Sequence, residues 1–416
     1  MKVEVVVISK EIIKPSSPTP DFLRKYKLSY LDQISPNLFM PLVYFYPAYG
    51  KISNWERSNQ LKKSLSEALT RFYPLAGRME DNLYVDCNDE GVEFFQANAK
   101  VEMSEILSNP IPGELKQFLP YDLNDSRDYC MAVQVSFLNC GGMAVGLIIS
   151  HKIADAMSFH MFANSWAAIA CGDTDIPYPK FDAATIFPPR DHVPVSKSVT
   201  KEEIVTKIFV FPTSKIDALK DKYANTNGEK RRPTRIEALS TFIWSRFMSS
   251  TQVEDNSNKI YSIEPIVNLR PRFDPPLSND YFGNFWIPAR LLITMDIDYE
   301  KESCGVVDKI REAISNVNGD YVAKLRQGYA AEMDIKDKQL VRFVFTSLCR
   351  FPIYEVDFGW GRPIWVASAS HGMKNKVAFF DTLSGNGIEA WINLKKEDMA
   401  KFEADMELCA FLSQTL

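Results

Sequence analysis

Apolar positions in the first half of the chain form two short runs followed by a helical repeat. Residues 131–138 and 143–149 are almost entirely apolar, and the four residues between them include two glycines. Two apolar runs of strand length joined by a glycine-containing turn predict a β-hairpin. Apolar side chains then recur at three- and four-residue steps over 156–170, which predicts a helix that stops at Gly172.

The same reasoning predicts strands and helices along the rest of the chain, without a regular alternation. The predicted strands are 3–8, 42–47, 83–87, 91–96, 208–211, 260–267 and 285–295, with a last hairpin around 384–387. The predicted helices are 55–73, 214–223, 235–249, 302–317, 320–333, 336–343 and 396–413. Two helices follow the spacing of a capping box, Ser53 with Glu56 and Thr234 with Glu237. This mixture indicates an α/β fold.

A proline-rich stretch divides the chain into two parts. It runs from Pro177 to about residue 205, contains five prolines and ends in a charged segment. Proline fixes one backbone angle and removes a hydrogen-bond donor, so the stretch favours an extended connection. We predict an N-terminal domain over 1–180, a crossover linker over 181–206 and a C-terminal domain over 207–416. A chain of 416 residues is long enough for two hydrophobic cores.

Composition narrows the possible partners and the location. The chain is 46% hydrophobic and 24% charged, which is ordinary for a globular protein. A net charge of −5 does not suggest a nucleic-acid partner, and no apolar run reaches the length of a membrane span. The N-terminal residues are too polar for a signal peptide. Seven cysteines without a CxxC pair fit free thiols in a reducing compartment, so we expect a cytoplasmic protein.

His151 is the first candidate for chemistry. It lies between the predicted hairpin and the predicted helix, at a strand end from which a side chain can reach a cleft. An imidazole titrates at about pH 6.5, so it can deprotonate a hydroxyl near neutral pH. The alternative is a histidine that packs at the strand end and bonds locally. The chain has only four histidines, and Asp155 lies four positions on, which favours the functional interpretation.

Two other uses of His151 are less favoured. A Ser-His-Asp triad would need Ser150, but neighbours on a strand point to opposite faces and no Gly-x-Ser-x-Gly elbow occurs. A metal site would need a third ligand at a suitable spacing, so we expect no metal. Asp155 either pairs with a distant arginine, for which Arg270 is the candidate, or is an acid favoured at a helix N-terminus.

A second marked stretch, 357–361, reads DFGWG. Two glycines that flank a tryptophan indicate a loop with special backbone angles. Phosphate binding is one interpretation, but no GxGxxG or Walker pattern accompanies the stretch. On its residues alone it is interpreted as a structural loop.

Taken together, the two stretches resemble the motifs of the plant BAHD acyl-CoA-dependent acyltransferases. Residues 151–155 match HxxxD and 357–361 match DFGWG. HxxxD alone also resembles the motif of carnitine and chloramphenicol acyltransferases and of peptide-synthetase condensation domains. Four further segments resemble sequences of the family: 72–78, 268–270, 281–284 and 385–391. The connector at 14–20 and residues 85–89 are similar to those of alkaloid O-acetyltransferases in the family.

The resemblance implies a fold and a reaction. The expected fold is two similar-sized mixed-sheet α/β domains of the chloramphenicol acetyltransferase type, joined by a long crossover, with an active-site channel between them. The expected co-substrate is acetyl-CoA, the acceptor is a small-molecule alcohol, no cofactor is bound permanently, and the protein is a monomer. His151 would be the general base of a direct transfer without an acyl-enzyme.

The resemblance also implies roles for other residues. Asp155 would pair with Arg270 and face away from the His151 ring. The DFGWG residues would support the site structurally: Asp357, Gly359, Trp360 and Gly361. Thr346 corresponds to the start of a Thr-Ser-Trp element that helps hold the intermediate, but this chain has Leu348 where the tryptophan stands. The lost indole N–H leaves Thr346 as the weaker oxyanion candidate. Asn284 would be another polar group near the channel, for an oxyanion or substrate contact, and the alternative is a residue of a structural turn.

A basic run is the candidate for CoA binding. Lys230, Arg231 and Arg232 precede the predicted cap Thr234, and phosphates favour cations and helix N-termini. A solvated surface run of charge is the alternative.

The acceptor is the most open question. An alkaloid hydroxyl is favoured, and the alternatives are an acylsugar, a terpenoid alcohol or a volatile alcohol, or a longer acyl donor. A catalytically silent relative that only binds is a different class, which the intact His151 and Asp155 disfavour. A condensation domain usually has two adjacent histidines, whereas residue 150 is serine.

Overall fold

The computed structural model divides into two compact units. The first comprises Met1–Val199, Leu277–Phe285 and Phe351–His371, and the second comprises Thr200–Pro276, Trp286–Arg350 and Gly372–Leu416. The described residues are 2–50, 52–123, 128–191, 193, 202–224, 231–251, 259–293, 303–328, 339–369 and 372–413.

The units are not continuous in sequence, whereas the sequence predicted two continuous domains joined by one linker. The first change of unit, after Val199, falls within the predicted linker 181–206. Two later segments return to the first unit, because their contacts are with its residues. The DFGWG stretch lies on one of these segments. It therefore belongs to the first unit and not to the C-terminal domain over 207–416 to which the sequence assigned it.

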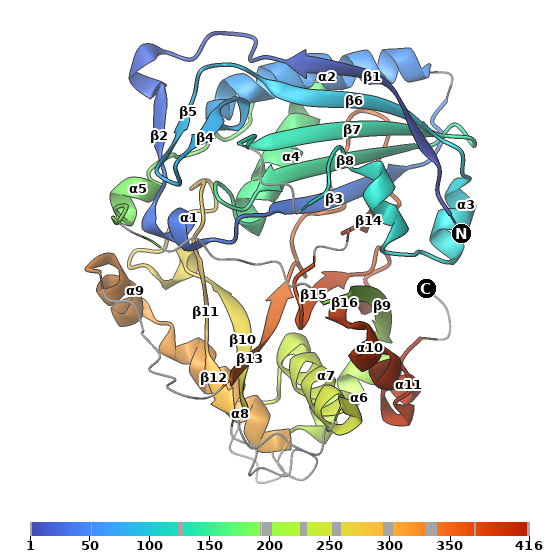
Figure 1. Ribbon diagram of the computed structural model, residues 1–416, viewed down its shortest axis with the longest axis vertical. Coiled ribbons are helices and arrows are strands. Elements are labelled where there is room, and N and C mark those ends of the chain that lie inside the picture. Colours follow the sequence, from blue (N-terminus) through green and yellow to red (C-terminus); the bar gives the residue numbers. More distant parts are fainter. Residues whose placement is uncertain are drawn as a thin grey trace. The chain divides into compact units, whose positions relative to one another are not determined.

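A six-stranded mixed sheet forms the centre of the first unit (Figure 1). Its order is β1-β6-β7-β8-β3-β14, and all neighbours are antiparallel except β6 and β7. The strands are β1 Val5–Ile13, β3 Phe39–Tyr46, β6 Val92–Ala99, β7 Met131–Leu138, β8 Met143–Ser150 and β14 Trp365–Ala367. Every residue of β7 and β8 is buried, which explains why these strands are almost entirely apolar, and their antiparallel pairing confirms the predicted hairpin.

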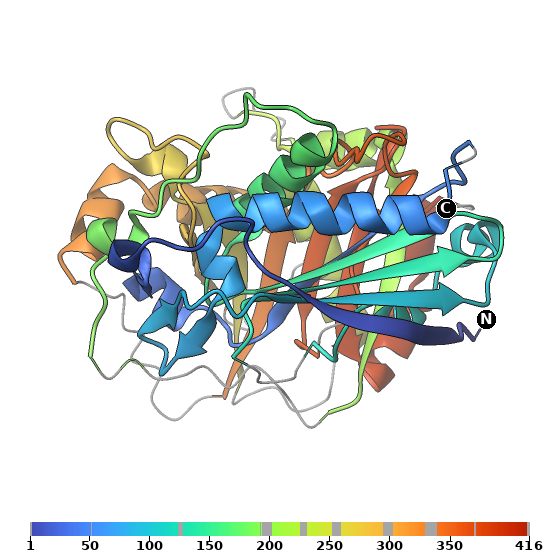
Figure 2. The same cartoon turned by 90° about the horizontal axis from the view of Figure 1, so that it is seen from above.

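Two long helices lie side by side on one face of this sheet (Figures 1 and 2). Helix α2, Asn54–Arg71, begins with the predicted capping box of Ser53 and Glu56. Helix α4, Ala156–Ala170, has the predicted bounds. The indole of Trp166 on α4 is buried and donates to Ser64 Oγ on α2 at 3.0 Å, so the polar atom of this core side chain is satisfied.

Short elements complete the first unit. They are the helices α1 Tyr30–Ile34, α3 Met103–Ser108 and α5 Ala183–Ile186, the 3-10 turns η1 Asp21–Leu23, η2 Tyr73–Ala76 and η3 Glu114–Phe118, and a small sheet of β2 Lys25–Lys27, β4 Arg78–Glu80 and β5 Tyr84–Asp86. Helix α5 lies within the predicted linker, so this stretch is not wholly extended.

The second unit is built on a seven-stranded mixed sheet. Strands β10, β13 and β15 are parallel, β16 and β9 continue the sheet in antiparallel pairing, and β11 and β12 both pair with β10. The strands are β9 Ile204–Pro212, β10 Lys259–Asn268, β11 Trp286–Pro288, β12 Leu291–Ile293, β13 Gln339–Ser347, β15 Lys376–Asp381 and β16 Gly387–Lys395. Antiparallel pairing of β15 with β16 confirms the last predicted hairpin.

Helix α7 is central to the core of the second unit. The helices of this unit are α6 Thr213–Lys222, α7 Arg235–Thr251, α8 Ser303–Asn316, α9 Gly319–Arg326, α10 Lys396–Glu403 and α11 Met406–Phe411, with a 3-10 turn η4 Arg270–Arg272. Helix α7 contacts α6, α8, α10 and α11. Its Trp244 is fully buried, with ring centroids 5.6 Å from those of both Tyr261 and Phe343 of the sheet.

The helix predicted at 336–343 is wrong. Its described part, from Gln339, is the first half of β13. Phe343 and Phe345 alternate into the core, and parallel neighbours pair with the strand on both sides. The period of two and the ladder hydrogen bonds therefore override the short apolar run that suggested a helix.

Two predicted elements are each interrupted. The strand predicted at 285–295 is two strands, because after Pro288 the Ala289 N–H donates to Pro265 O and β12 pairs with a different part of β10. The helix predicted at 396–413 stops at Glu403, and Asp405 then caps α11 by accepting the Leu408 N–H at 2.7 Å.

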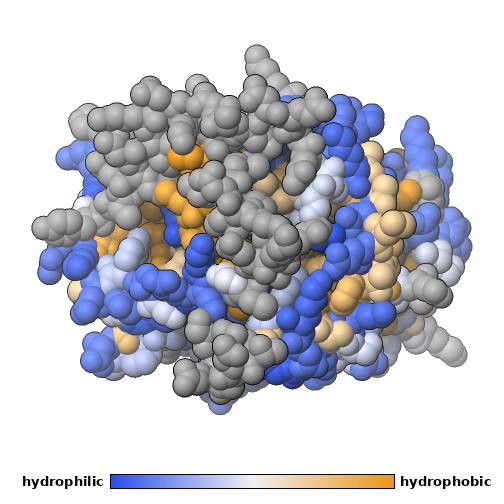
Figure 3. Space-filling model, turned by 90° about the horizontal axis from the view of Figure 1, so that it is seen from below, coloured by the Kyte–Doolittle hydropathy of each residue, from blue (hydrophilic) through white to orange (hydrophobic). Residues whose placement is uncertain are grey.

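Figure 3 shows the hydropathy of the described residues on one face of the molecule. Hydrophilic side chains dominate its coloured part, and hydrophobic ones are visible in separate places. Within the described ranges, no helix combines the length and the apolar character that crossing a bilayer requires.

Gly146 of β8 provides a test of the packing that supports the first unit. A Cβ at this position would overlap the backbone carbonyl oxygen of Phe118 in η3. Because a buried backbone has little room to move, we expect Gly146→Ala to lower the free energy of unfolding by about 1–3 kcal/mol in urea denaturation. Gly113→Ala is the matched control, since nothing lies within 4 Å of its added methyl. Equal midpoints for the two variants would contradict the close approach.

Candidate active site

His151 is the first residue after β8, and its backbone and ring are both held. Its N–H donates to the Leu38 carbonyl at 2.9 Å, which extends the β8–β3 ladder beyond the strand end. Ring Nδ1 lies 3.0 Å from the Ala154 carbonyl oxygen. Because a carbonyl can only accept, Nδ1 carries the proton in this contact, and the lone pair is on Nε2. The fold therefore selects the tautomer in which Nε2 is the basic nitrogen.

The two neighbours of His151 are buried and bonded. Ser150 Oγ accepts the Lys152 N–H at 3.3 Å, and Lys152 Nζ donates to the Gln33 carbonyl at 2.6 Å. Burial lowers the pKa of Lys152 to about 8, against the opposing attraction of Asp32. The Ser150 hydroxyl is hydrogen-bonded to the local backbone, which agrees with the prediction that Ser150 is not a nucleophile.

Asp155 joins two segments of the first unit. Its Oδ1 accepts the Ser158 N–H at 2.9 Å and so caps α4. Its Oδ2 accepts the Phe285 N–H at 3.0 Å, from a segment 130 residues later in the chain. Both predicted interpretations of Asp155 as a structural acid are compatible with this geometry. The cap satisfies an N–H that the helix leaves free.

The predicted pairing of Asp155 with Arg270 stays a prediction, since Arg270 belongs to the second unit. Arg270 is buried, and its backbone N–H donates to Asn268 Oδ1 at 3.0 Å.

Asn284 is hydrogen-bonded to Asp32 and to the backbone of His151. Its side chain is fully buried, and Nδ2 lies 2.8 Å from both Asp32 Oδ1 and the His151 carbonyl oxygen. Both neighbours are acceptors, which fixes the amide orientation and uses both of its hydrogens. Both amide N–H bonds are therefore used within the first unit, which favours the structural interpretation of Asn284, and a contact with an oxyanion or substrate stays a prediction.

The sequence did not indicate that three residues, Asp32, Gln33 and Lys152, are bonded in the surroundings of His151. One sequence signal does mark Asp32. Ser29 and Asp32 have the spacing of a capping box, and the structure forms it at the start of α1. That signal predicts a helix start. Only the folded chain shows that the same carboxylate also binds Asn284.

The DFGWG loop is held at the far end of α4 from His151. Asp357 Oδ1 accepts the N–H groups of Gly359 and Gly361 at 2.8 and 2.9 Å. Gln60 Nε2 donates to both Ala170 O and Phe358 O, which ties the loop to the last residue of α4. At a rise of about 1.5 Å per residue, the length of α4 separates this end from His151 by roughly 20 Å.

Trp360 of the DFGWG loop packs against aromatic side chains of the first unit. It is almost fully buried, with its ring centroid 5.7 Å from that of Phe358 and 6.3 Å from that of Tyr46. Tyr46 Oη in turn donates to the Val356 carbonyl at 2.7 Å. These contacts favour the interpretation that the stretch supports the fold and does not touch reacting atoms.

The predicted CoA-binding run receives little support from its surroundings. Lys230 lies outside the described residues, and Arg231 is exposed. Arg232 is paired with Asp217 and Asp221, at 3.6 and 2.7 Å. The capping box of Thr234 also places the Glu237 carboxylate at the N-terminus of α7, where a phosphate would otherwise bind.

Thr346 lies on β13 and is partly exposed. Buried Phe345 points into the core of the second unit, so the alternation of the strand turns Thr346 to the opposite face. The Leu348 N–H donates to Phe379 O at 2.8 Å, so the backbone beyond Thr346 remains tied to β15.

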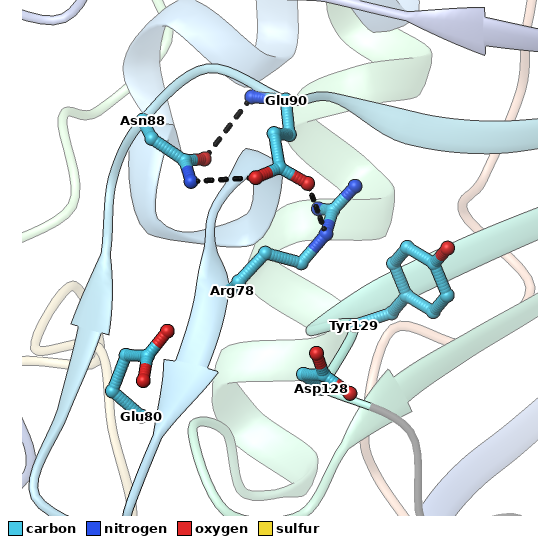
Figure 4. A pocket seen from close by; sticks show the side chains of 6 residues that line it. All are labelled: Arg78, Glu80, Asn88, Glu90, Asp128 and Tyr129. Carbon is cyan, nitrogen blue, oxygen red and sulfur yellow. Dashed lines mark hydrogen bonds and ion pairs between the residues drawn. The ribbon is translucent and has the colours of Figure 1, made fainter.

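A polar pocket of about 430 Å³ lies on the first unit (Figure 4). Its lining residues are Arg78, Glu80, Asn88, Glu90, Asp128 and Tyr129. Arg78 is paired with Glu90 at 2.9 Å, so the remaining charge of the lining is negative. An acidic lining repels CoA phosphates, and none of the predicted chemical residues belongs to it.

A model of the Transferase family matches residues 1–409. The chain belongs to this family, the BAHD acyltransferases. Stemmadenine O-acetyltransferase of Catharanthus roseus is 36% identical over 416 residues, with 97% of each chain covered. Limonoid 21-O-acetyltransferase of Melia azedarach is 38% identical over 422 residues, with 98% of each covered. The crystal structure of vinorine synthase aligns with a TM-score of 0.86 at 32% identity, over 99% of both chains.

These similarities confirm the predicted class of fold and of enzyme. The BAHD transferase has the mixed α/β architecture of vinorine synthase. It is an acyl-CoA-dependent O-acetyltransferase that uses acetyl-CoA as co-substrate and a small-molecule hydroxyl compound as acceptor.

The role of the DFGWG loop can be tested with Asp357→Ala. Loss of two hydrogen bonds to the loop backbone should lower the free energy of unfolding by about 1–3 kcal/mol. Because the loop is far from His151, kcat per folded molecule should change less than about twofold. Asp173→Ala is the control, since Asp173 Oδ1 accepts one N–H in an exposed turn. A stable Asp357→Ala protein without turnover would show instead that the loop acts in the reaction.

His160 should make the BAHD transferase sensitive to acid. The ring is buried on α4 between Phe159 and Phe351, and neither nitrogen has a hydrogen-bond partner among the described residues. Burial lowers the pKa of His160 to about 3, against the attraction of Asp155. The unfolded chain thus binds the proton first. The contribution of the neutral His160 ring to the free energy of unfolding is fully present above about pH 6.5. It decreases by about 1.4 kcal/mol per pH unit as the pH falls from 6.5 towards 3.

The measurement is urea denaturation of the wild type and of His160→Gln between pH 5 and 7. The variant keeps a polar side chain without titration, so its stability should vary less with pH. Identical slopes would contradict the buried neutral imidazole.

Proposed function

We propose that this BAHD transferase moves the acetyl group of acetyl-CoA to a hydroxyl of a plant specialised metabolite, with His151 as the general base. The observation that carries the proposal is the Nδ1–Ala154 O contact, because it leaves the lone pair on Nε2. The side chain is partly exposed, so the ring is accessible to a reactant.

The proposed reaction is a direct transfer between two bound substrates. Nε2 of His151 accepts the proton of the acceptor hydroxyl while its oxygen attacks the thioester carbonyl carbon. The tetrahedral intermediate then collapses, the carbon–sulfur bond breaks, and the departing CoA sulfur receives the proton from His151. A base of this kind contributes roughly 10²- to 10⁴-fold in rate, and positioning of both substrates contributes more.

Charge that develops on the carbonyl oxygen would be stabilised by Thr346. Leu348 cannot donate a hydrogen bond through its side chain, so this chain lacks the tryptophan donor of the resembling element. Arg231 and Lys230 remain candidates for the CoA phosphates, whereas the pairing of Arg232 makes it the weakest of the three.

Two acceptor classes are proposed. An alkaloid hydroxyl is favoured by the full-length similarity to stemmadenine O-acetyltransferase and salutaridinol 7-O-acetyltransferase. A terpenoid alcohol is supported by the 38% identity to limonoid 21-O-acetyltransferase, which is no lower than the identity to the alkaloid enzymes. An acylsugar hydroxyl or a longer acyl-CoA is the remaining alternative.

We further propose that the enzyme acts as a cytoplasmic monomer without a permanently bound cofactor. The support is chemical. Among the side chains that the structure describes, six cysteines are free thiols: Cys87, Cys130, Cys140, Cys171, Cys349 and Cys409. Three of these are exposed, which suits a reducing compartment.

The proposal is tested by thiol release from acetyl-CoA in the presence of alkaloid, limonoid, sugar and simple alcohols. The wild type should release CoA with at least one alcohol and form its ester. His151→Ala should lower kcat by roughly 10²- to 10⁴-fold, because the hydroxyl loses its base. A variant as active as the wild type would refute His151 as the base. Absence of release with every alcohol would refute the acceptor classes.

A further inference from the structure

The carbonyl of His151 lies where the regular ladder has ended. Strand β8 stops at Ser150, and the last bond that continues its pairing with β3 is the one from the His151 N–H to Leu38 O. The peptide group between His151 and Lys152 lies beyond this ladder and needs other partners for its orientation. The structure supplies two substitutes. Asn284 Nδ2 donates to the His151 carbonyl at 2.8 Å, and Ser150 Oγ accepts the following N–H, of Lys152, at 3.3 Å. The peptide plane that follows the histidine is thereby held at both ends.

Asn284 is itself held by a buried carboxylate. Asp32 is fully buried and its Oδ1 accepts both the backbone N–H and the side-chain Nδ2–H of Asn284, each at 2.8 Å. Its Oδ2 accepts from the Ser29 N–H and hydroxyl at 2.8 and 2.7 Å. Four donors on one buried carboxylate form a fully satisfied network, which is rigid because each missing bond would leave a buried polar group unpaired.

The adjoining residues attach the same segment to α4. Gly283 O accepts the Ser158 hydroxyl at 2.9 Å, and the Phe285 N–H donates to Asp155 Oδ2 at 3.0 Å. Asn284 is therefore flanked by two residues bonded to the first turn of α4, the helix that follows His151. The backbone on either side of Asn284 cannot shift without disturbing these bonds.

We propose that Asp32 and Asn284 are a positioning pair that fixes the His151 peptide and thereby the direction of Nε2. The inference rests on the proposed function of His151 as the base. The pair does not touch the reactants. It acts through the backbone of His151, because the Cα–Cβ direction of the ring follows from the orientation of the two flanking peptides. A displacement of about 1 Å at a reacting group can lower a rate about a hundredfold.

The first test is Asn284→Ala in the full chain, assayed with acetyl-CoA and an alcohol that the wild type accepts. We expect kcat to fall tenfold to a hundredfold, while KM for both substrates changes less than about twofold. Asn164→Ala is the matched control, because Asn164 on α4 also donates to two backbone carbonyls, of His160 and Pro352. The control should keep wild-type kcat. A rise in KM with unchanged kcat for Asn284→Ala would overturn the proposal.

A second variant addresses folding. Asn284→Leu is close in shape to asparagine, has no donor for the His151 carbonyl and adds no charge beside the buried Asp32 carboxylate. If the alanine variant does not fold, the leucine variant should show the same loss of kcat per folded molecule. Full activity of a folded Asn284→Leu protein would overturn the pair.

The decisive measurement is a double-mutant cycle with His151→Ala. If Asn284 acts only through His151, then adding Asn284→Ala to His151→Ala should not lower the residual rate further. A further tenfold loss would show that Asn284 acts independently and would overturn the inference. The outcomes separate the two proposals. An active His151→Ala enzyme refutes the base, whereas an inactive His151→Ala beside a fully active Asn284→Ala refutes only the pair.

Discussion

The Asp155 carboxylate is the interaction on which the site of the first unit depends. One oxygen caps the helix that follows the histidine, and the other binds the backbone of a segment that arrives from much later in the chain. Both acceptors are buried with their donors, so replacing the carboxylate would leave two N–H groups unpaired. The aspartate of the HxxxD stretch thus orders the surroundings of the histidine and is bonded to backbone on two sides.

Two hydrogen bonds set the state and the orientation of His151, one from its ring to a nearby backbone carbonyl and one to its own carbonyl from a distant amide side chain. Its ring bond to Ala154 selects a tautomer, and its carbonyl bond to Asn284 restrains the peptide behind the ring. Neither bond needs a charged partner beside the imidazole. A neutral imidazole with its lone pair on Nε2 suits a base that accepts a proton and then returns it to the leaving sulfur.

Much of the local structure could be predicted from the sequence. The β7–β8 hairpin, helix α4 and both capping boxes follow from apolar period, glycines and side-chain spacing, which are properties of neighbouring residues. Predictions failed where distant pairing decided the outcome. Residues 339–343 form a strand because β10 and β15 lie on either side, and the predicted strand at 285–295 divides because two parts of it pair with different residues of β10.

The sequence by itself determined the chemistry that is available: a histidine at a strand end, an acid four residues later, and two motifs of one transferase family. Tertiary structure decided how these residues are used. It directs the Asn284 amide to the His151 backbone, and it brings in Asp32, which the motif does not contain. The physical reason is that a hydrogen bond depends on distance and direction in space. Residues 32, 151 and 284 meet only when the chain returns to the first unit.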